Sequence, residues 1–153
     1  MKYLRYLVIS AVIVLACAAV CHFTGVNNAN LATVQLVPSD IIWKADPNLH
    51  GLQTAVLAGE PSGRGAYVQR IRIPANTTLK PHTHPNRAGM ITVLSGTFYF
   101  AYGDKFDEAK LKRLPPGSFF TEPKGMPHYA VTKEGDVVLQ LNAIGPDGTS
   151  YIK

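Results

Sequence analysis

Residues 117–128 read Gly-Ser-Phe-Phe-Thr-Glu-Pro-Lys-Gly-Met-Pro-His, and they specify the type of fold more clearly than any other part of the chain. A short strand-favouring run lies between a Pro-Pro-Gly turn at 115–117 and a Pro-Lys-Gly turn at 123–125. Glycine tolerates the positive φ that tight corners between strands require. His128 then opens a second predicted strand, so the stretch indicates antiparallel strands joined by tight turns.

Similar runs recur on both sides of this stretch, and helical periodicity is almost absent. In residues 67–73 the side chains alternate, with Arg70 and Arg72 on the face opposite Ile71 and Ile73. The predicted strands are 34–37, 53–57, 67–73, 90–94, 97–102, 118–121, 128–132 and 137–141, with one helical turn near 107–111. The sequence therefore predicts an all-β fold, a small antiparallel β-barrel or jelly roll built from two sheets.

Length and charge allow one domain and argue against nucleic acid as a partner. The 153 residues suit a single domain, and the net charge of +5 includes Lys2 and Arg5 at the start of the chain. Elsewhere basic and acidic residues are mixed, and no basic helix or aromatic-basic stripe is present in the sequence. We expect a small-molecule substrate or ligand and no nucleic acid.

The first residues form a separate segment with the pattern of an export signal. Lys2 and Arg5 precede sixteen uncharged residues, 6–21, which are rich in Val, Ile, Leu and Ala. Both cysteines of the chain, Cys17 and Cys21, lie in this segment, so the folded domain has no disulfide and no thiol nucleophile. Contact with a membrane is expected only through this segment.

We divide the chain into a signal peptide or N-terminal membrane anchor at 1–23, a linker at 24–32 and a folded domain at 33–153. Residues 14–17, Val-Leu-Ala-Cys, also resemble a lipoprotein cleavage box. Cleavage, anchoring and lipidation all remain open. The prediction is an exported protein, periplasmic or secreted, with membrane anchoring or lipidation as alternatives.

Three histidines are placed to bind a metal. His82 and His84 are two residues apart, so on a strand both imidazoles point to the same face. His128 opens another predicted strand. Imidazole is the commonest neutral ligand of Zn, Fe, Mn, Ni and Cu, so a divalent transition metal is the predicted cofactor.

The residues around these histidines resemble the two motifs of the cupin superfamily. Pro81-His82-Thr83-His84-Pro85 followed by Gly96 is close to the first motif, and Gly117, Pro123-Lys124-Gly125 and His128 match the second in spacing. The similarity covers about 66–145 and, more loosely, 43–151. It is strongest to small single-domain cupins of the Cupin_2 or RmlC-like jelly-roll type. The resemblance implies a domain at 33–153 with His82, His84 and His128 around a metal between two sheets, and a possible homodimer.

One position departs from the cupin pattern. Counting back from Gly96 places Gly89 where the family has a glutamate ligand, and neither Asn86 nor Arg87 is a good substitute. Three interpretations follow: three histidines bind the metal alone, Gln140 faces inward and supplies an oxygen, or the pocket binds a small molecule without metal. If Gly89 marks a vacant ligand position, Gly89→Glu should tighten metal binding.

No catalytic residue can be assigned, but several side chains are candidates for substrate contacts. Gln140 or Tyr99 could orient a substrate, although Tyr99 is more typical of a ring that fills the barrel. Gln69, on the Ile71 face, could line the pocket or form a hydrogen bond to a neighbouring strand. Arg87, next to the metal loop, could contact an anionic substrate, but we expect it to be a solvated loop residue.

The resemblance supports three functions. The first is a metal-dependent oxidoreductase, dioxygenase-like, acting on a small organic substrate. The alternative is a non-catalytic cupin that binds or senses a metal or ligand in the cell envelope. Isomerase activity on a sugar or keto acid has no distinct residue in its favour.

Overall fold

The structure is a computed structural model that describes residues 33–47 and 49–153. The predicted signal or anchor at 1–23 and the predicted linker at 24–32 lie outside the described residues. Within the described part of the chain, no helix is long and apolar enough to cross a membrane.

The described residues are almost entirely strands and turns. Two short 3-10 helices, η1 (Pro38–Asp40) and η2 (Glu108–Lys110), accompany the strands. The strands are β1 (Lys44–Ala45), β2 (Gln53–Ala58), β3 (Ala66–Ile73), β4 (Thr78–Thr83), β5 (Gly89–Ser95), β6 (Phe98–Tyr102), β7 (Lys112–Leu114), β8 (Phe119–Glu122), β9 (His128–Thr132), β10 (Val137–Ile144) and β11 (Ser150–Tyr151).

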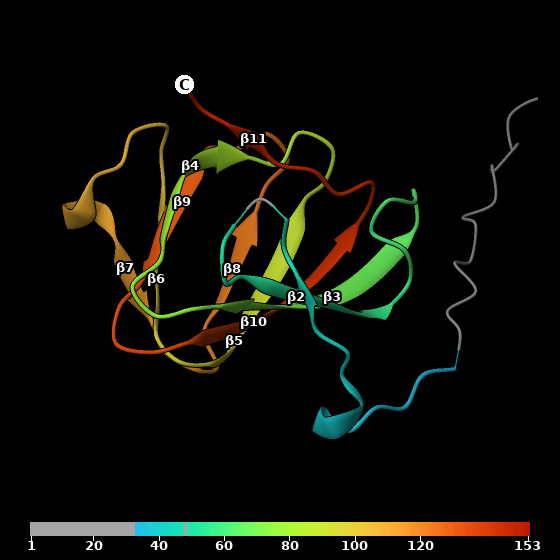
Figure 1. The fold of residues 1–153 in the computed structure, drawn as a ribbon. Coiled ribbons are helices and arrows are strands. Elements are labelled where there is room, and N and C mark those ends of the chain that lie inside the picture. Colours follow the sequence, from blue (N-terminus) through green and yellow to red (C-terminus); the bar gives the residue numbers. More distant parts are fainter. Residues whose placement is uncertain (1–32, 48) are drawn as a thin grey trace, which may run out of the picture.

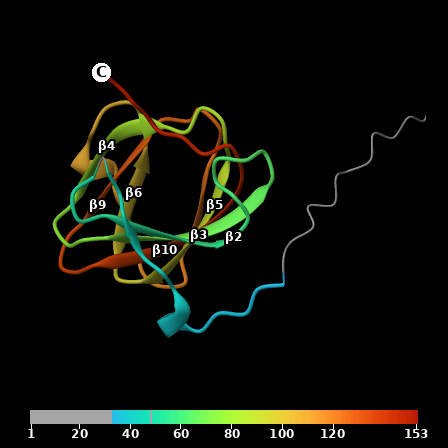
Figure 2. The same ribbon diagram turned by 45° about the vertical axis from the view of Figure 1, so that its right-hand side comes forward.

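These strands form two antiparallel sheets that enclose a common core. The larger sheet has the order β1-β2-β3-β10-β5-β8 and the smaller sheet has the order β11-β4-β9-β6-β7. The two views show the sheets wrapped around one centre, with η1 outside them (Figures 1 and 2). The sheets do not join into a single closed barrel, and the prediction of an all-β jelly roll is confirmed.

Alternation along the strands places apolar side chains in the space between the sheets. In β10 the buried residues Leu139 and Leu141 alternate with the partly exposed Val138 and Gln140. The core also receives aromatic rings from Phe98, Phe100 and Phe120 of β6 and β8. This apolar layer supports the site described below.

The predicted strand at 34–37 is wrong, and four strands of the structure, β1, β4, β7 and β11, are absent from the predicted set. Residues 34–37 are not in a sheet: Val34 and Val37 are exposed, and Pro38 begins η1. The strands β7 and β11 are too short for a clear alternating pattern. In β4, Pro81 interrupts the run, and the pairing with β9 shifts register between Leu79 and His82.

Candidate metal centre

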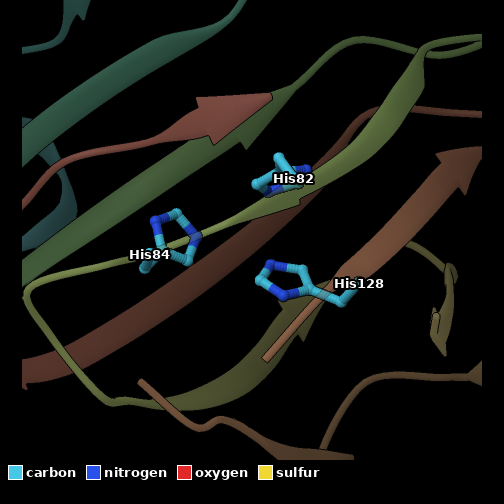
Figure 3. Close-up of side chains that lie close together, drawn as sticks. All are labelled: His82, His84 and His128. Carbon is cyan, nitrogen blue, oxygen red and sulfur yellow. The ribbon is translucent and has the colours of Figure 1, made fainter. Parts of the chain in front are cut away.

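Three histidine side chains meet on the inner face of the smaller sheet, where β4 pairs with β9. His82 in β4 is the direct cross-strand partner of His128 in β9, and His84 lies one residue beyond the end of β4. The ring centroids are 4.4 Å apart for His82 and His128 and 5.1 Å apart for His84 and His128. Figure 3 shows the three rings gathered together. One ligand atom from each histidine lies within 4.8 Å of the other two, so this group could hold a metal ion.

Backbone carbonyls fix the tautomer of each ring. The Nδ1 atoms donate to the carbonyls of Lys80 at 2.6 Å for His82, Gly148 at 2.8 Å for His84 and Met126 at 2.9 Å for His128. Because a neutral imidazole carries one proton, Nδ1–H leaves the lone pair on Nε2. Hydrogen bonding of the other ring nitrogen is also how metal-ligating histidines are usually oriented.

The three histidines are buried, and their surroundings favour the neutral form of each ring. Burial lowers the pKa of His82, His84 and His128, and their backbone hydrogen bonds and the negative charge of Glu122 only partly offset this effect. The Nε2 atom of His128 is buried with no hydrogen-bond partner. A buried nitrogen lone pair without a donor is costly unless a cation satisfies it. The residues therefore fit a bound divalent metal.

The histidines belong to the lining of a cavity of about 280 Å³ between the sheets. Other polar residues at the cavity wall are Asp46, Thr54, Gln69, Arg87, Glu122, Asp147, Thr149 and Tyr151. The apolar wall includes Leu52, Ile71, Ile73, Leu79, Phe98 and Leu139. The cavity thus combines a metal-binding group and charged side chains with an apolar interior.

Comparison with known proteins identifies the family. The family model described as "Cupin domain" matches residues 69–143, a range that holds all three histidines. This chain contains a cupin domain. The predicted resemblance is therefore confirmed.

The curated relatives of this cupin are plant germin-like proteins. It is 28% identical to putative germin-like protein 9-2 of Oryza sativa subsp. japonica over 65% of this chain and 48% of that protein. It is also 28% identical to putative germin-like protein subfamily 1 member 12 of Arabidopsis thaliana, over 72% of this chain and 46% of that protein. The chain spans about half the length of the curated relatives it matches.

Solved structures share the fold of this cupin. The polyketide cyclase RemF of Streptomyces resistomycificus matches with a TM-score of 0.63 and 19% identity, covering 80% of this chain and 87% of that one. KdgF of Halomonas sp. matches with a TM-score of 0.57 and 22% identity, covering 71% of this chain and 93% of that one. At these identities the likeness concerns the fold alone.

Sequence reasoning missed Glu122, a carboxylate that contacts two of the histidines. Its Oε2 lies 3.3 Å from Nε2 of His84 and its Oε1 lies 3.5 Å from Nε2 of His128. Glu122 ends β8, in the other sheet, and its direct cross-strand partner is Gly89 of β5. The protein therefore has a carboxylate, that of Glu122, on the strand next to residue 89, where the family motif has a glutamate and this chain has glycine.

The expectation that Arg87 is solvated is wrong. Only 3% of its surface is exposed, and its guanidinium forms ion pairs with Glu122 at 2.8 Å and with Asp147 at 2.6 Å. Burial disfavours the charged forms of Arg87 and Asp147. The attraction of Arg87 to Glu122 and to Asp147 outweighs that cost, so the pKa of Arg87 is raised and the pKa of Asp147 is lowered. Arg87 is thus a charged residue of the cavity wall.

The three candidate substrate contacts lie in different places. Gln69 lines the cavity, and its Nε2 donates to Asp147 at 3.4 Å. Gln140 does not face inward: it accepts a hydrogen bond from Arg70 at 3.4 Å on the side of β10 opposite Leu139 and Leu141. It therefore cannot supply an oxygen ligand to a metal at the three histidines.

Tyr99 also lies away from the cavity. Its ring packs beneath Lys133, with Nζ 4.8 Å from the ring centroid. Its β6 neighbours Phe98 and Phe100, one residue away on either side, line the cavity. Alternation along β6 therefore points Tyr99 to the opposite face.

Gly89 provides space for Arg87 instead of marking a vacant ligand position. A Cβ at residue 89 would lie 2.5 Å from Nη1 of Arg87 and 2.8 Å from Cδ1 of Leu141. Both atoms belong to side chains that are fixed, one by two ion pairs and the other by the core. A side chain at residue 89 would displace them.

Gly89→Ala is expected to lower the free energy of unfolding by about 1–3 kcal/mol, as overpacking of a buried site commonly does. For the same reason, Gly89→Glu should not tighten metal binding. Urea unfolding of Gly89→Ala and metal titration of Gly89→Glu measure the two effects. A Gly89→Glu variant that folds normally and binds metal more tightly would contradict this account.

Proposed function

We propose that this cupin is a metal-dependent oxidoreductase, dioxygenase-like, which acts on a small organic substrate. The observation that supports the proposal is the convergence of three imidazole nitrogens in the lining of a cavity between the sheets. His82, His84 and His128 would hold a divalent transition metal through Nε2. When bound, such a metal supplies Lewis-acid or redox activation of the substrate.

The cavity wall suggests the substrate class. Its lining combines the histidines and Arg87 with aliphatic and aromatic side chains such as Leu52, Ile73 and Phe98. A ligand that fills a cavity with this mixed lining needs both a polar group and an apolar body. We therefore infer an amphiphilic small molecule with oxygen or sulfur donors at its polar end.

The polar residues of the wall have defined tasks in this proposal. The ion pair between Arg87 and Asp147 holds both side chains in place, and Gln69 extends this network along the wall. Gln69 is placed to orient a polar group of the substrate. The apolar wall would exclude water from the substrate body.

Metal analysis followed by oxygen-uptake measurement tests this function. Protein loaded with Fe²⁺, and separately with the other candidate metals, would be supplied with catechols, diketones and thiols that carry apolar bodies. Oxygen uptake that needs both metal and substrate, and that is absent from the His82→Ala/His84→Ala variant, would support the proposal. Stoichiometric metal binding with no oxygen consumption across the panel would reject the oxidoreductase.

A non-catalytic binding or sensing cupin is the second candidate. Glu122 lies against two of the three imidazoles, which leaves less room for a substrate beside the metal. Retention of a ligand without turnover in the same experiment would favour this function.

We also propose that the protein is exported. The support is the charged start and apolar run within residues 1–23. Cell fractionation of the full chain, with N-terminal sequencing of the recovered product, tests export and separates cleavage from anchoring. Recovery of the intact chain from the cytoplasm would contradict it.

A further inference from the structure

We propose that Glu122 is a fourth ligand of the metal centre and takes over the role of the carboxylate that the chain lacks at residue 89. This inference rests on the metal binding in the proposed function. It concerns a residue that lies outside the histidine pattern and belongs to the other sheet.

The distances suit two donors of one ion. Atoms that each lie about 2.1 Å from a metal are separated by about 3.0 Å at a right angle and about 3.4 Å at a tetrahedral angle. The separations of 3.3 Å between Glu122 and His84 and 3.5 Å between Glu122 and His128 fall close to this range. The two contacts use different oxygens of the carboxylate, so Glu122 faces the space between the two Nε2 atoms.

The charges around Glu122 favour a cation at this point. Nδ1 of His84 and Nδ1 of His128 face backbone carbonyls, so Nε2 of each neutral ring presents a lone pair toward the carboxylate. Two acceptors that face each other repel. A metal ion satisfies the nitrogens and the carboxylate at the same time.

The strand register explains how Glu122 reaches the histidines. Gly89 and Glu122 are direct partners in the pairing of β5 with β8. The carboxylate of Glu122 therefore comes from the strand next to the one that carries residue 89, where the family has its glutamate ligand. Arg87 occupies the space that a side chain at residue 89 would fill, and its Nη1 donates to Oε2 of Glu122 at 2.8 Å. Ligating carboxylates are commonly held by such a hydrogen bond. Arg87 is therefore a positioning residue for Glu122.

Titration with Co²⁺ tests the proposal without any assay of activity. The full-length protein and its Glu122→Gln variant would be titrated in competition with a chromophoric chelator, while the visible absorption of Co²⁺ reports the number and kind of ligands. Glu122→Gln should weaken Co²⁺ binding by about 100-fold or more, because changes even outside the ligand set cost 10–100-fold. The intensity of the Co²⁺ bands should also change.

Three further variants separate ligation from indirect effects. Glu108→Gln makes the same chemical change at an exposed glutamate and should leave Co²⁺ binding as in the unaltered protein. Glu122→Asp keeps the charge but shortens the reach, and should also weaken binding. Asp147→Asn removes the other partner of Arg87 and should weaken Co²⁺ binding much less than Glu122→Gln.

The outcomes distinguish this inference from the proposed function. Failure of the unaltered protein to bind any of the candidate metals would overturn the metal-dependent function and this inference with it. Normal binding by the unaltered protein, with the same affinity and spectrum in folded Glu122→Gln, would overturn the role of Glu122 alone. An equal loss in Asp147→Asn would show that Glu122 acts through Arg87 and not as a ligand.

Discussion

Replacing Arg87 with methionine is expected to lower the free energy of unfolding of the metal-free protein by about 3 kcal/mol, because it leaves two carboxylates without their cationic partner. Arg87 and Glu122 are largely buried, at 3% and 13% side-chain exposure. Asp147 keeps 26% of its side chain exposed. We therefore expect a loss of stability at the lower end of the range that is usual when a buried ion pair loses one partner. Urea unfolding at neutral pH in the presence of a chelator measures this loss.

Two further variants show whether charge causes the effect. Arg113→Met removes an exposed arginine from β7 and should change the free energy of unfolding by less than about 0.5 kcal/mol. The triple variant Arg87→Met/Glu122→Gln/Asp147→Asn removes the unpaired charges and should regain part of the lost stability. Equal stability of Arg87→Met and Arg113→Met would mean that the ion pairs contribute nothing to folding.

The histidine cluster was predictable from the sequence because it depends on short-range geometry. Two histidines separated by one residue share a face of any strand, and the glycine and proline spacing before His128 fixes where the next strand begins. The all-β fold follows from equally local signals, the alternation at 67–73 and the regular turns. The structure adds that His82 and His128 are cross-strand partners, which no local pattern specifies.

The acidic part of the site was not predictable because it depends on contacts between distant segments. Glu122 lies within the second motif as one of its spacer residues, and only the register of β5 against β8 places it opposite Gly89. Arg87 follows a Pro-Asn pair in a polar turn, a context that usually indicates exposure. Its burial depends on carboxylates from residues 122 and 147, which the sequence alone does not bring together.

The same limit explains the errors about Gln140 and Tyr99. Each lies in a correctly predicted strand, but which face of a strand points inward depends on its neighbours. In β10 the apolar residues Val137, Leu139 and Leu141 take the inner face, so Gln140 must take the outer one. In β10 the alternation of Val137, Leu139 and Leu141 could therefore have predicted that Gln140 faces outward.

Replacing both His82 and His84 with alanine is expected to abolish metal binding, and replacing His128 alone should weaken it by at least about 100-fold. The physical reason is that each histidine supplies one of very few donors to the metal. Each ring is also already oriented by a hydrogen bond from Nδ1 to the backbone carbonyl of another residue. Metal analysis of the purified variants, with circular dichroism to verify their folding, measures the loss.

His50→Ala is the matched control, since His50 is exposed and lies outside the cluster. It should retain the metal content of the unaltered protein. Undiminished metal in folded His128→Ala would exclude His128 as a ligand and with it the three-histidine centre. Loss in the cluster variants but not in His50→Ala would instead make the orphaned Nε2 of His128 a metal donor. The identity of the retained metal would then decide which substrates to examine first.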